Sequence, residues 1–392
     1  MSSPTTPTPA TSAAGVGGRA LQGLREVLRT VDIQAAEAAG RLPEGLLGEL
    51  GERGLLLPCR SRDVGGLALN QYELGALCEE LGGQWVSLLS VLTAHMMAAE
   101  AIGRWGNHEL AATVLAEAAG GRRQLAFALS EPEAGSDAEG VRSHAEPAAE
   151  GYRITGVKTW LSGGQDADLF LVLAQSPGGP IALLVDRADP GVEVTPIEPL
   201  LGFRAAGLAQ LAMNEVVVPA RRVVGRPASG LRHVAATALD HGRFCLAWGG
   251  VGLAQASLRN CADRTAQRHQ FGSPLLDHQL VRAMLSDMLV ETAAARLLCA
   301  EAARLREEGA PEALVYTSMA KYRSARTAAR ATRDALQLHG AFGTSAGHPV
   351  ERAFRDAKLL ELVEGTEQIH QATIAGHIQR LAYPRVDGAS VL

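Results

Sequence analysis

One glutamate in this sequence is well placed to remove a proton from a substrate. Glu364 stands directly before Gly365 and Thr366, where one helix is expected to end and another to begin. A carboxylate at such a junction projects from the chain instead of lying on a solvated helix face. An isolated glutamate is still a surface residue far more often than a base, by roughly ten to one. The pattern alone therefore makes Glu364 a candidate base.

Two segments near the middle of the chain could contact a planar polar ligand. A predicted strand ends near Ser130 and enters a turn of small residues that continues to Ser136, leaving backbone N–H groups and both hydroxyls available. Further along, Trp160 and Ser162 precede two glycines, and a tryptophan there could cover one face of a flavin ring. The commoner interpretations are an ordinary turn for the first segment, at roughly 80%, and a core tryptophan for the second.

A third segment could bind a phosphate and a base. Arg268 and Phe271 lie where a helix is expected to end at Gly272, with a new helix after Pro274. A guanidinium can bind a pyrophosphate in a bidentate manner, and a phenyl ring can pack on a base. An arginine in the last turn of a helix also interacts favourably with the helix dipole, which is the commoner role for an isolated arginine.

The elements that must position these residues change type twice along the chain. Apolar residues recur at helical spacing from about residue 20 to 120 and again after residue 231, and short β-type runs lie between. We expect strands over residues 125–129, 152–160, 169–174, 181–185, 192–197 and 211–219. These strands are not interleaved with helices, which argues against a doubly wound or barrel fold. The predicted fold is α+β, mainly α.

The expected helices and strands divide the 392 residues into a tail and three domains. Residues 1–18 are rich in Ser, Thr, Pro, Ala and Gly and are predicted to form a disordered tail. An N-terminal helical domain is expected over 19–122, a middle antiparallel β domain over 123–230, and a C-terminal helical domain over 231–392.

Composition excludes several classes of protein. The net charge of -5 comes from 42 acidic and 37 basic residues that are well mixed, so neither nucleic acid nor an anionic membrane is indicated as a partner. The five cysteines are far apart and lack a C-x-x-C pair, so no disulfide framework and no metal site is expected, and a cytoplasmic location is favoured. We expect no signal peptide and no uninterrupted apolar segment that approaches the roughly 20 residues needed to span a membrane. A Rossmann nucleotide site is not supported either, because no G-x-G-x-x-G follows a strand and opens a helix.

Taken together and in this order, the segments resemble the acyl-CoA dehydrogenase superfamily over the chain after Gly18. Each match is weak alone, but the whole set, occurring in the same order as in the superfamily, is specific. The matching motifs are Ser130-Glu-Pro-x-Ala-Gly-Ser-Asp137 for T-E-P-x-A-G-S-D, Trp160-x-Ser162 for W-I-T, Val216-Val-Val-Pro219 for V-x-V-P, Arg268-x-x-Phe-Gly272, Gln337-x-x-Gly340, Arg355-Asp-Ala-Lys358 and Glu364-Gly-Thr366.

The resemblance implies a C-terminal four-helix bundle and an FAD held between it, the middle β domain and a neighbouring subunit. It therefore implies a homodimer or homotetramer. The residues carried over to the flavin ring are Phe127, Leu129, Ser130, Ser136, Trp160 and Ser162. Those carried over to the adenosine and pyrophosphate, some of them across the subunit interface, are Arg268, Phe271, Gln337, Gly340, Thr366 and Gln368.

The reaction that the resemblance implies is α,β-dehydrogenation of an acyl thioester. Glu364 would take the α-proton while the β-hydrogen moves as hydride to flavin N5, and a flavoprotein or another acceptor would remove the electrons. The α-hydrogen is only weakly acidic, so the base needs a raised pKa and the developing enolate needs hydrogen-bond donors.

Some members of the superfamily place the base on an earlier helix, which here contains residues 240–244. Gly242 aligns with that alternative position, so Glu364 is the carboxylate we assign, and Asp240 is close enough in sequence to be a rival.

The sequences of several motifs depart from the usual pattern of the superfamily. Val363 replaces an aromatic residue, Ser162 replaces a threonine, and residues 201–207 lack the usual Ser/Asp cluster. The Arg-Ala-Ala-Gly sequence there resembles dehydrogenases of polyketide extender-unit pathways, including the methoxymalonyl route, which act on acyl groups bound to acyl carrier protein.

The rival functions are a flavin oxidase or monooxygenase with the same fold and a non-catalytic helical interaction protein.

Overall fold

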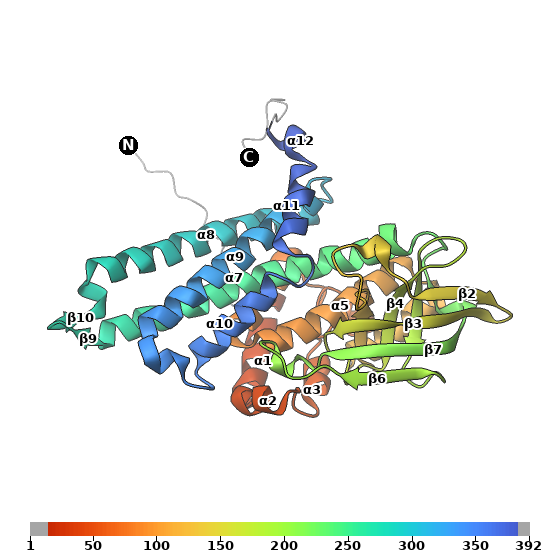
Figure 1. Cartoon of the computed structure of the whole chain (residues 1–392), viewed down its shortest axis with the longest axis horizontal. Helices are drawn as coiled ribbons and strands as arrows, with labels where there is room; N and C mark the ends of the chain where they lie inside the picture. Colours follow the sequence, from red (N-terminus) through yellow and green to blue (C-terminus); the bar gives the residue numbers. More distant parts are fainter. Residues whose placement is uncertain (1–14, 383–392) are drawn as a thin grey trace.

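The computed structural model of the chain describes residues 15–382. A helical part, a β part and a second helical part follow one another, as Figure 1 shows. The predicted order and fold class are therefore confirmed. The predicted tail lies mostly outside the described residues, but its last residues are wrong as a tail, because helix α1 begins at Val16.

The N-terminal part contains six helices. Their bounds are α1 Val16–Thr30, α2 Ile33–Ala39, α3 Leu46–Glu52, α4 Gln71–Gln84, α5 Val86–Trp105 and α6 His108–Ala119. Helix α4 begins where its sequence provides a complete cap: Asn70 accepts from the Glu73 backbone N–H, and the Glu73 carboxylate accepts from the Asn70 backbone N–H.

The β part is formed by two four-stranded sheets. The strands are β1 Leu125–Ala128, β2 His144–Ala148, β3 Gly151–Leu161, β4 Leu169–Ala174, β5 Ile181–Asp186, β6 Val192–Pro196, β7 Ala209–Pro219 and β8 Val223–Val224. Their orders are β1-β4-β5-β8 and β2-β3-β7-β6. The expectation of a purely antiparallel domain is wrong: β1 pairs with β4 in parallel, because the chain passes through the second sheet between them, and an isolated parallel bridge joins His144 to Gln175.

Strand β4 shows why the first sheet lies in the middle of the molecule. All six of its residues are buried. Phe170 and Val172 point into the core between the two sheets, whereas Leu169, Leu171 and Leu173 belong to the core shared with the helices. A strand covered on both faces is expected to read as an unbroken apolar run, and this one does.

The C-terminal part is built on four long helices with two short ones after them. The bounds are α7 Ala236–Gln267, α8 Gln279–Glu307, α9 Ala313–His339, α10 Pro349–Leu360, α11 Glu367–Ala375 and α12 Ile378–Ala382. The expected helix end at Gly272 is wrong. Helix α7 ends at Gln267, and β9 (His269–Gln270) and β10 (Ser273–Pro274) form a hairpin whose two turn residues, Phe271 and Gly272, have φ of 52° and 81°.

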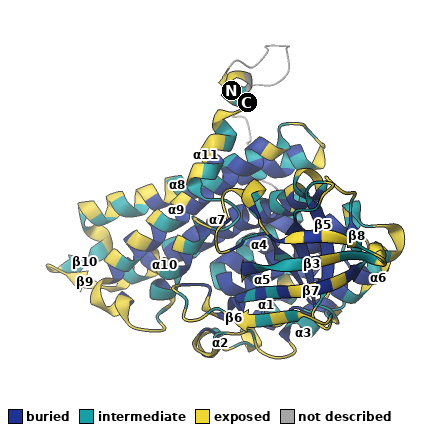
Figure 2. Cartoon of the chain, turned by 45° about the vertical axis from the view of Figure 1, so that its right-hand side comes forward, coloured by how far each residue is buried: buried dark blue, intermediate teal, exposed yellow. Residues whose placement is uncertain are grey.

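Helix α5 is the central helix of the molecule. It packs against α4, α6, α7 and β1, and Figure 2 shows it within the dark blue interior. By length and composition it could cross a membrane, although His95, Glu100 and Arg104 interrupt its apolar residues, so it is not the uninterrupted apolar segment whose absence was expected. Its burial inside this fold identifies it as a core helix, since 89% of its most apolar window is buried.

Candidate active site

Glu364 lies in the turn between α10 and α11, as its position before Gly365 predicts. Its φ of 57° places the backbone in the left-handed region. The Arg243 guanidinium, from α7, donates through Nε to the Glu364 carbonyl oxygen at 3.0 Å and so fixes the turn. The carboxylate atom Oε2 is buried and has no hydrogen-bond partner among the described residues.

The surroundings of Glu364 give its carboxyl group a pKa near neutral pH. Burial raises the pKa of Glu364 to about 7, although the positive charges of Arg243 and Lys321 oppose that rise. Lys321, from α9, is itself buried and donates to the Leu360 carbonyl oxygen at 2.6 Å. Burial lowers the pKa of Lys321 to about 8. Such a carboxyl group can exchange a proton near pH 7, as a general base requires.

The rival carboxylate is engaged elsewhere. Asp240 forms an ion pair with Arg306, and the Arg306 guanidinium lies over the Phe244 ring at 4.7 Å from its centroid. Gly242, by contrast, faces the candidate base: a Cβ built on it would lie 3.1 Å from Cδ of Glu364. The glycine at the alternative position therefore leaves room for the Glu364 carboxylate.

Trp160 is not a core residue. The pairing of β3 with β7 is irregular between Lys158 and Leu161, and Trp160 within this bulge has φ 63°. Its side chain is 59% exposed, although Thr159 and Leu161 on either side are buried. The bulge thus turns an indole outward at the end of the strand, which is the geometry needed to cover a planar ligand.

A buried ion pair joins the turn after β1 to the strand that bears Trp160. Lys158 Nζ lies 2.7 Å from Glu131 Oε1 and 3.0 Å from the Leu129 carbonyl oxygen, and the exposed fractions of the Lys158 and Glu131 side chains are 0% and 4%. The carboxylate also accepts from the backbone N–H groups of Arg142 and Ser143. Burial alone would raise the pKa of Glu131, but these hydrogen bonds lower it to about 2.

This ion pair explains how two of the predicted segments meet. The Thr159 N–H also donates to the Ser130 carbonyl oxygen at 2.9 Å. The backbone of Ser130 is therefore tied to the bulge that holds Trp160, as the resemblance requires. Phe127 lies within β1 and Leu129 directly follows the strand; both contact the core shared with the helices, and Ser136 is exposed on the turn.

Helix α5 connects this β-domain region to Glu364. The Ser90 and Ser162 hydroxyls are 2.8 Å apart. Seven residues further along α5, the sulfur of Met97 would lie 2.5 Å from a Cβ built on Gly242, the residue that faces Glu364. Positions seven apart share one face of a helix and are separated by about 10 Å along its axis. The two halves of the predicted site thus lie along one face of α5.

The residues predicted to bind the adenosine and pyrophosphate lie elsewhere. Arg268 and Phe271 are on the β9–β10 hairpin, and Gln337 and Gly340 are at the end of α9, all exposed. The two regions share one end of the bundle, because Arg264 at the end of α7 lies over the Phe342 ring. Figure 1 shows this end on the opposite side of the molecule from the β sheets. A single chain therefore does not bring them to Trp160 or Glu364.

Thr366 and Gln368 form a third location. Thr366 is the N-cap residue of α11, and Gln368 is exposed in its first turn. They are close to Glu364 in the chain, at the base of the α11–α12 segment that extends from the body in Figure 1.

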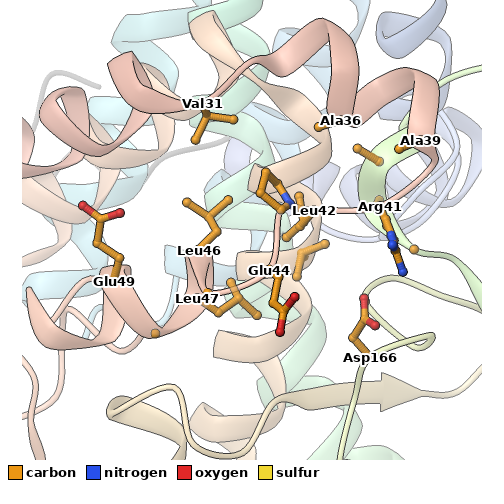
Figure 3. A pocket seen from close by; sticks show the side chains of 18 of the residues that line it. Val31, Ala36, Ala39, Arg41, Leu42, Glu44, Leu46, Leu47, Glu49 and Asp166 are labelled. Carbon is orange, nitrogen blue, oxygen red and sulfur yellow. The ribbon is translucent and has the colours of Figure 1, made fainter.

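A large surface pocket exists apart from these residues. Its volume is about 1150 Å³, and it is lined mainly by α2, α3 and the loop between them, together with residues such as Asp166 from the β domain. Figure 3 shows the apolar side chains of Leu42, Leu46 and Leu47 along it. None of the predicted site residues lines this pocket, so its size alone does not make it the reaction site.

Several residues around the site were not predicted from the sequence. Only the folded chain brings four of them to the site: Lys158, Arg243, Lys321 and Met97. Buried lysines are rare, and that rarity is the one signal that could have drawn attention to Lys158 and Lys321. His370 is also buried beneath the turn, and neither of its ring nitrogens has a partner among the described residues. Burial and the nearby charges of Lys321 and Arg243 lower the pKa of His370 to about 3, so it is neutral.

Comparison with known proteins identifies the class. Models of the N-terminal, middle and C-terminal domains of acyl-CoA dehydrogenases match residues 22–122, 126–216 and 228–379. The acryloyl-CoA reductase (NADH) of Anaerotignum propionicum is 31% identical over 341 residues, which cover 85% of each chain. The chain belongs to the acyl-CoA dehydrogenase family, and the predicted resemblance is confirmed.

Two solved structures extend the comparison. FkbI, of the biosynthesis of the methoxymalonyl extender unit of the polyketide Fk520, is 33% identical with a TM-score of 0.85 and covers 93% of this chain and 100% of its own. A glutaryl-CoA dehydrogenase from Mycobacterium smegmatis in complex with FADH2 is 26% identical with a TM-score of 0.87 and covers 94% and 96%.

The buried ion pair leads to a prediction about stability. Lys158→Met leaves the Glu131 carboxylate buried without its cation, so we expect a loss of about 3–5 kcal/mol in the free energy of unfolding. Urea unfolding followed by circular dichroism measures it. The double variant Lys158→Met/Glu131→Gln removes the uncompensated charge and should be more stable than the single variant. A Lys158→Met protein within about 1 kcal/mol of the wild type would contradict the assignment.

Proposed function

We propose that this chain is an FAD-dependent dehydrogenase of acyl thioesters in which Glu364 is the catalytic base. The observation that supports this most directly is the buried Oε2 of Glu364, which faces Gly242 on α7 and has no hydrogen-bond partner within residues 15–382, in a chain of the acyl-CoA dehydrogenase family. The ion pair that occupies Asp240 supports the choice between the two carboxylates.

The residues present fit an FAD. The exposed Trp160 indole, held in a bulge with φ 63°, offers a flat face beside the Ser130 backbone and the Ser162 hydroxyl. These residues would hold the ring system, and Arg268, Phe271, Gln337, Gly340, Thr366 and Gln368 would hold the rest. The complex of the glutaryl-CoA dehydrogenase with FADH2 is consistent with that cofactor. FAD, when bound, supplies an acceptor for the β-hydride.

The protein's own groups then act on the α-proton. The Glu364 carboxylate takes it, and the Arg243 hydrogen bond to the Glu364 carbonyl holds the base in position while it does so. Burial excludes water from Oε2 and keeps the carboxylate basic enough to remove a weakly acidic proton. Lys321 and Arg243 favour the charged form and prevent the pKa from rising further.

We further propose that the acyl group is carried by coenzyme A or by an acyl carrier protein, in the biosynthesis of a polyketide extender unit. The similarity to FkbI over nearly the whole chain supports a role in extender-unit biosynthesis. A panel of thioesters on both carriers, including C3 acyl groups with and without hydroxyl substituents, distinguishes them by anaerobic bleaching of the flavin. Fast reoxidation by air would instead favour an oxidase, and a colourless protein that takes up no FAD would favour a non-catalytic role.

The cofactor residues at the far end of the bundle support a homodimer or homotetramer. Phe271 is 96% exposed beside Arg268, and α8 also exposes Leu280 and Leu297, at 80% and 71%. We infer that a second copy covers these surfaces and that each FAD contacts two chains. The five cysteines are free, which supports the cytoplasmic location.

The first prediction for this function concerns pH. Because Glu364 must be ionised to act and its pKa is about 7, the single-turnover rate of flavin bleaching should rise as the pH increases through 7. At pH 6 the rate should be about one-tenth of its plateau. Stopped-flow absorbance under anaerobic conditions measures it. A rate that does not change between pH 5.5 and 8.5 would show that another group is the base.

The second prediction concerns the base itself. Glu364→Gln replaces the carboxylate by an amide of nearly the same size, so FAD content should be normal while bleaching slows by about 10²- to 10⁴-fold. Asp240→Asn is the matched control on α7 and should retain the larger part of the wild-type rate. If Asp240→Asn abolishes bleaching and Glu364→Gln does not, the base is on the earlier helix.

The third prediction separates a shared cofactor site from one within a single chain. Arg268→Ala and Trp160→Ala should each lose FAD, because they remove opposite ends of the same site. If the two ends come from different chains, refolding an equal mixture should restore FAD to about a quarter of the sites, since half of the dimers contain both variants and one intact site each. No restoration, or a monomer by sedimentation that retains FAD, would contradict the proposed assembly.

A further inference from the structure

The hydroxyl group of Ser90 on α5 bonds across to the β domain and not along its own helix. Other helix hydroxyls of this chain, among them Ser257, Thr265 and Thr292, donate to the carbonyl oxygen four residues earlier. Ser90 forms no such bond within the described residues. Its Oγ lies 2.8 Å from Oγ of Ser162, and this is the one hydrogen-bond partner of the Ser90 hydroxyl within residues 15–382.

The burial of the two hydroxyl groups decides which of them donates. Ser90 is 6% exposed, whereas Ser162 is only partly buried. If Ser162 donated to Ser90, the Ser90 hydrogen would be buried without an acceptor, and the desolvation of that donor would cost free energy. If Ser90 donates, its hydrogen is satisfied and the Ser162 hydrogen stays at the more accessible of the two positions. The second arrangement is therefore the stable one.

The backbone next to Ser162 is held firmly in place. Gly163 donates its N–H to the Ala206 carbonyl oxygen at 2.7 Å, and its own carbonyl oxygen accepts from the Gln124 side chain at 2.8 Å. A Cβ built on Gly163 would lie 2.4 Å from Nε2 of Gln124, so the turn fits closely. Rotation of the Ser162 side chain and its hydroxyl is therefore the main freedom that remains, and the Ser90 hydroxyl restricts it.

We infer that Ser90 donates to Ser162 and thereby directs the Ser162 hydrogen toward an acceptor atom of the bound cofactor. This inference rests on the proposed function, in which Ser162 lies at the flavin ring. A hydroxyl that accepts one hydrogen bond is polarised and donates a stronger one. Ser90 is then a positioning residue that acts on the cofactor through Ser162.

The test is the affinity for FAD, measured by equilibrium dialysis of the holoenzyme and its variants. Ser90→Ala removes the donor, so the dissociation constant of FAD should rise about two- to tenfold, the effect of one neutral hydrogen bond. The visible absorption bands of the bound flavin should shift in the same direction as in Ser162→Ala. Alanine favours a helix, so Ser90→Ala should fold. A Ser90→Ala protein with the wild-type dissociation constant and spectrum overturns the inference.

A double variant distinguishes positioning from packing. If Ser90 acts through Ser162, Ser90→Ala should change the dissociation constant of FAD by less than about twofold in a Ser162→Ala background. An equal further loss in that background would show that Ser90 supports the site by packing alone, which overturns the inference. Thr93→Val is the matched control. It removes another buried hydroxyl of α5, one without a hydrogen-bond partner within the described residues, and should leave FAD binding unchanged.

One more variant keeps the inference testable if Ser90→Ala does not fold. Ser90→Cys retains a group of similar size, but its S–H is a weak donor, so FAD binding should weaken in the same direction. A Ser90→Cys protein with the wild-type affinity and spectrum would then overturn the inference. A wild-type protein that takes up no FAD contradicts the proposed function instead.

Discussion

The site depends on one buried helix that contacts both of the other parts of the molecule. Ser90 of α5 meets Ser162 of the β domain, and Met97 meets Gly242 beside Glu364. His95, between them, accepts a hydrogen bond from the Leu125 N–H at the start of β1. Burial lowers the pKa of His95 to about 4, so its ring stays neutral and can accept. The spacing between the region of Ser162 and the candidate base Glu364 is thus set by helix geometry and not by a flexible linker.

Much of the fold could be predicted from the sequence because the hydrophobic period changes sharply. The six expected strands all exist, and β4 is an unbroken apolar run because it is covered on both faces. Glu364 could be placed between two helices because Gly365 follows it. What could not be predicted were features set by neighbours far apart in sequence, such as the parallel pairing of β1 with β4.

The candidate site shows the same limit more clearly. Motif wording identified Trp160, but the common expectation for a tryptophan at a strand end is burial, and only the bulge reveals that it faces outward. The Lys158–Glu131 ion pair could not be predicted from the sequence, because only the fold shows that both residues are buried. Phe271 and Arg268 show the opposite case. Their roles in one site were expected, yet the folded chain places them at the other end of the bundle.

The charges around Glu364 explain why the pKa of its carboxyl group depends on several helices of the C-terminal part. A buried carboxylate alone would become neutral, and one paired directly with a cation would stay ionised but be a weak base. Here Arg243 donates to the backbone carbonyl of Glu364, and Lys321 donates to the Leu360 carbonyl. Both cations therefore act on the carboxylate through space without occupying Oε2. The result is a pKa near neutrality with the proton-accepting atom left open, which needs residues from α7, α9 and the turn after α10 held in one arrangement.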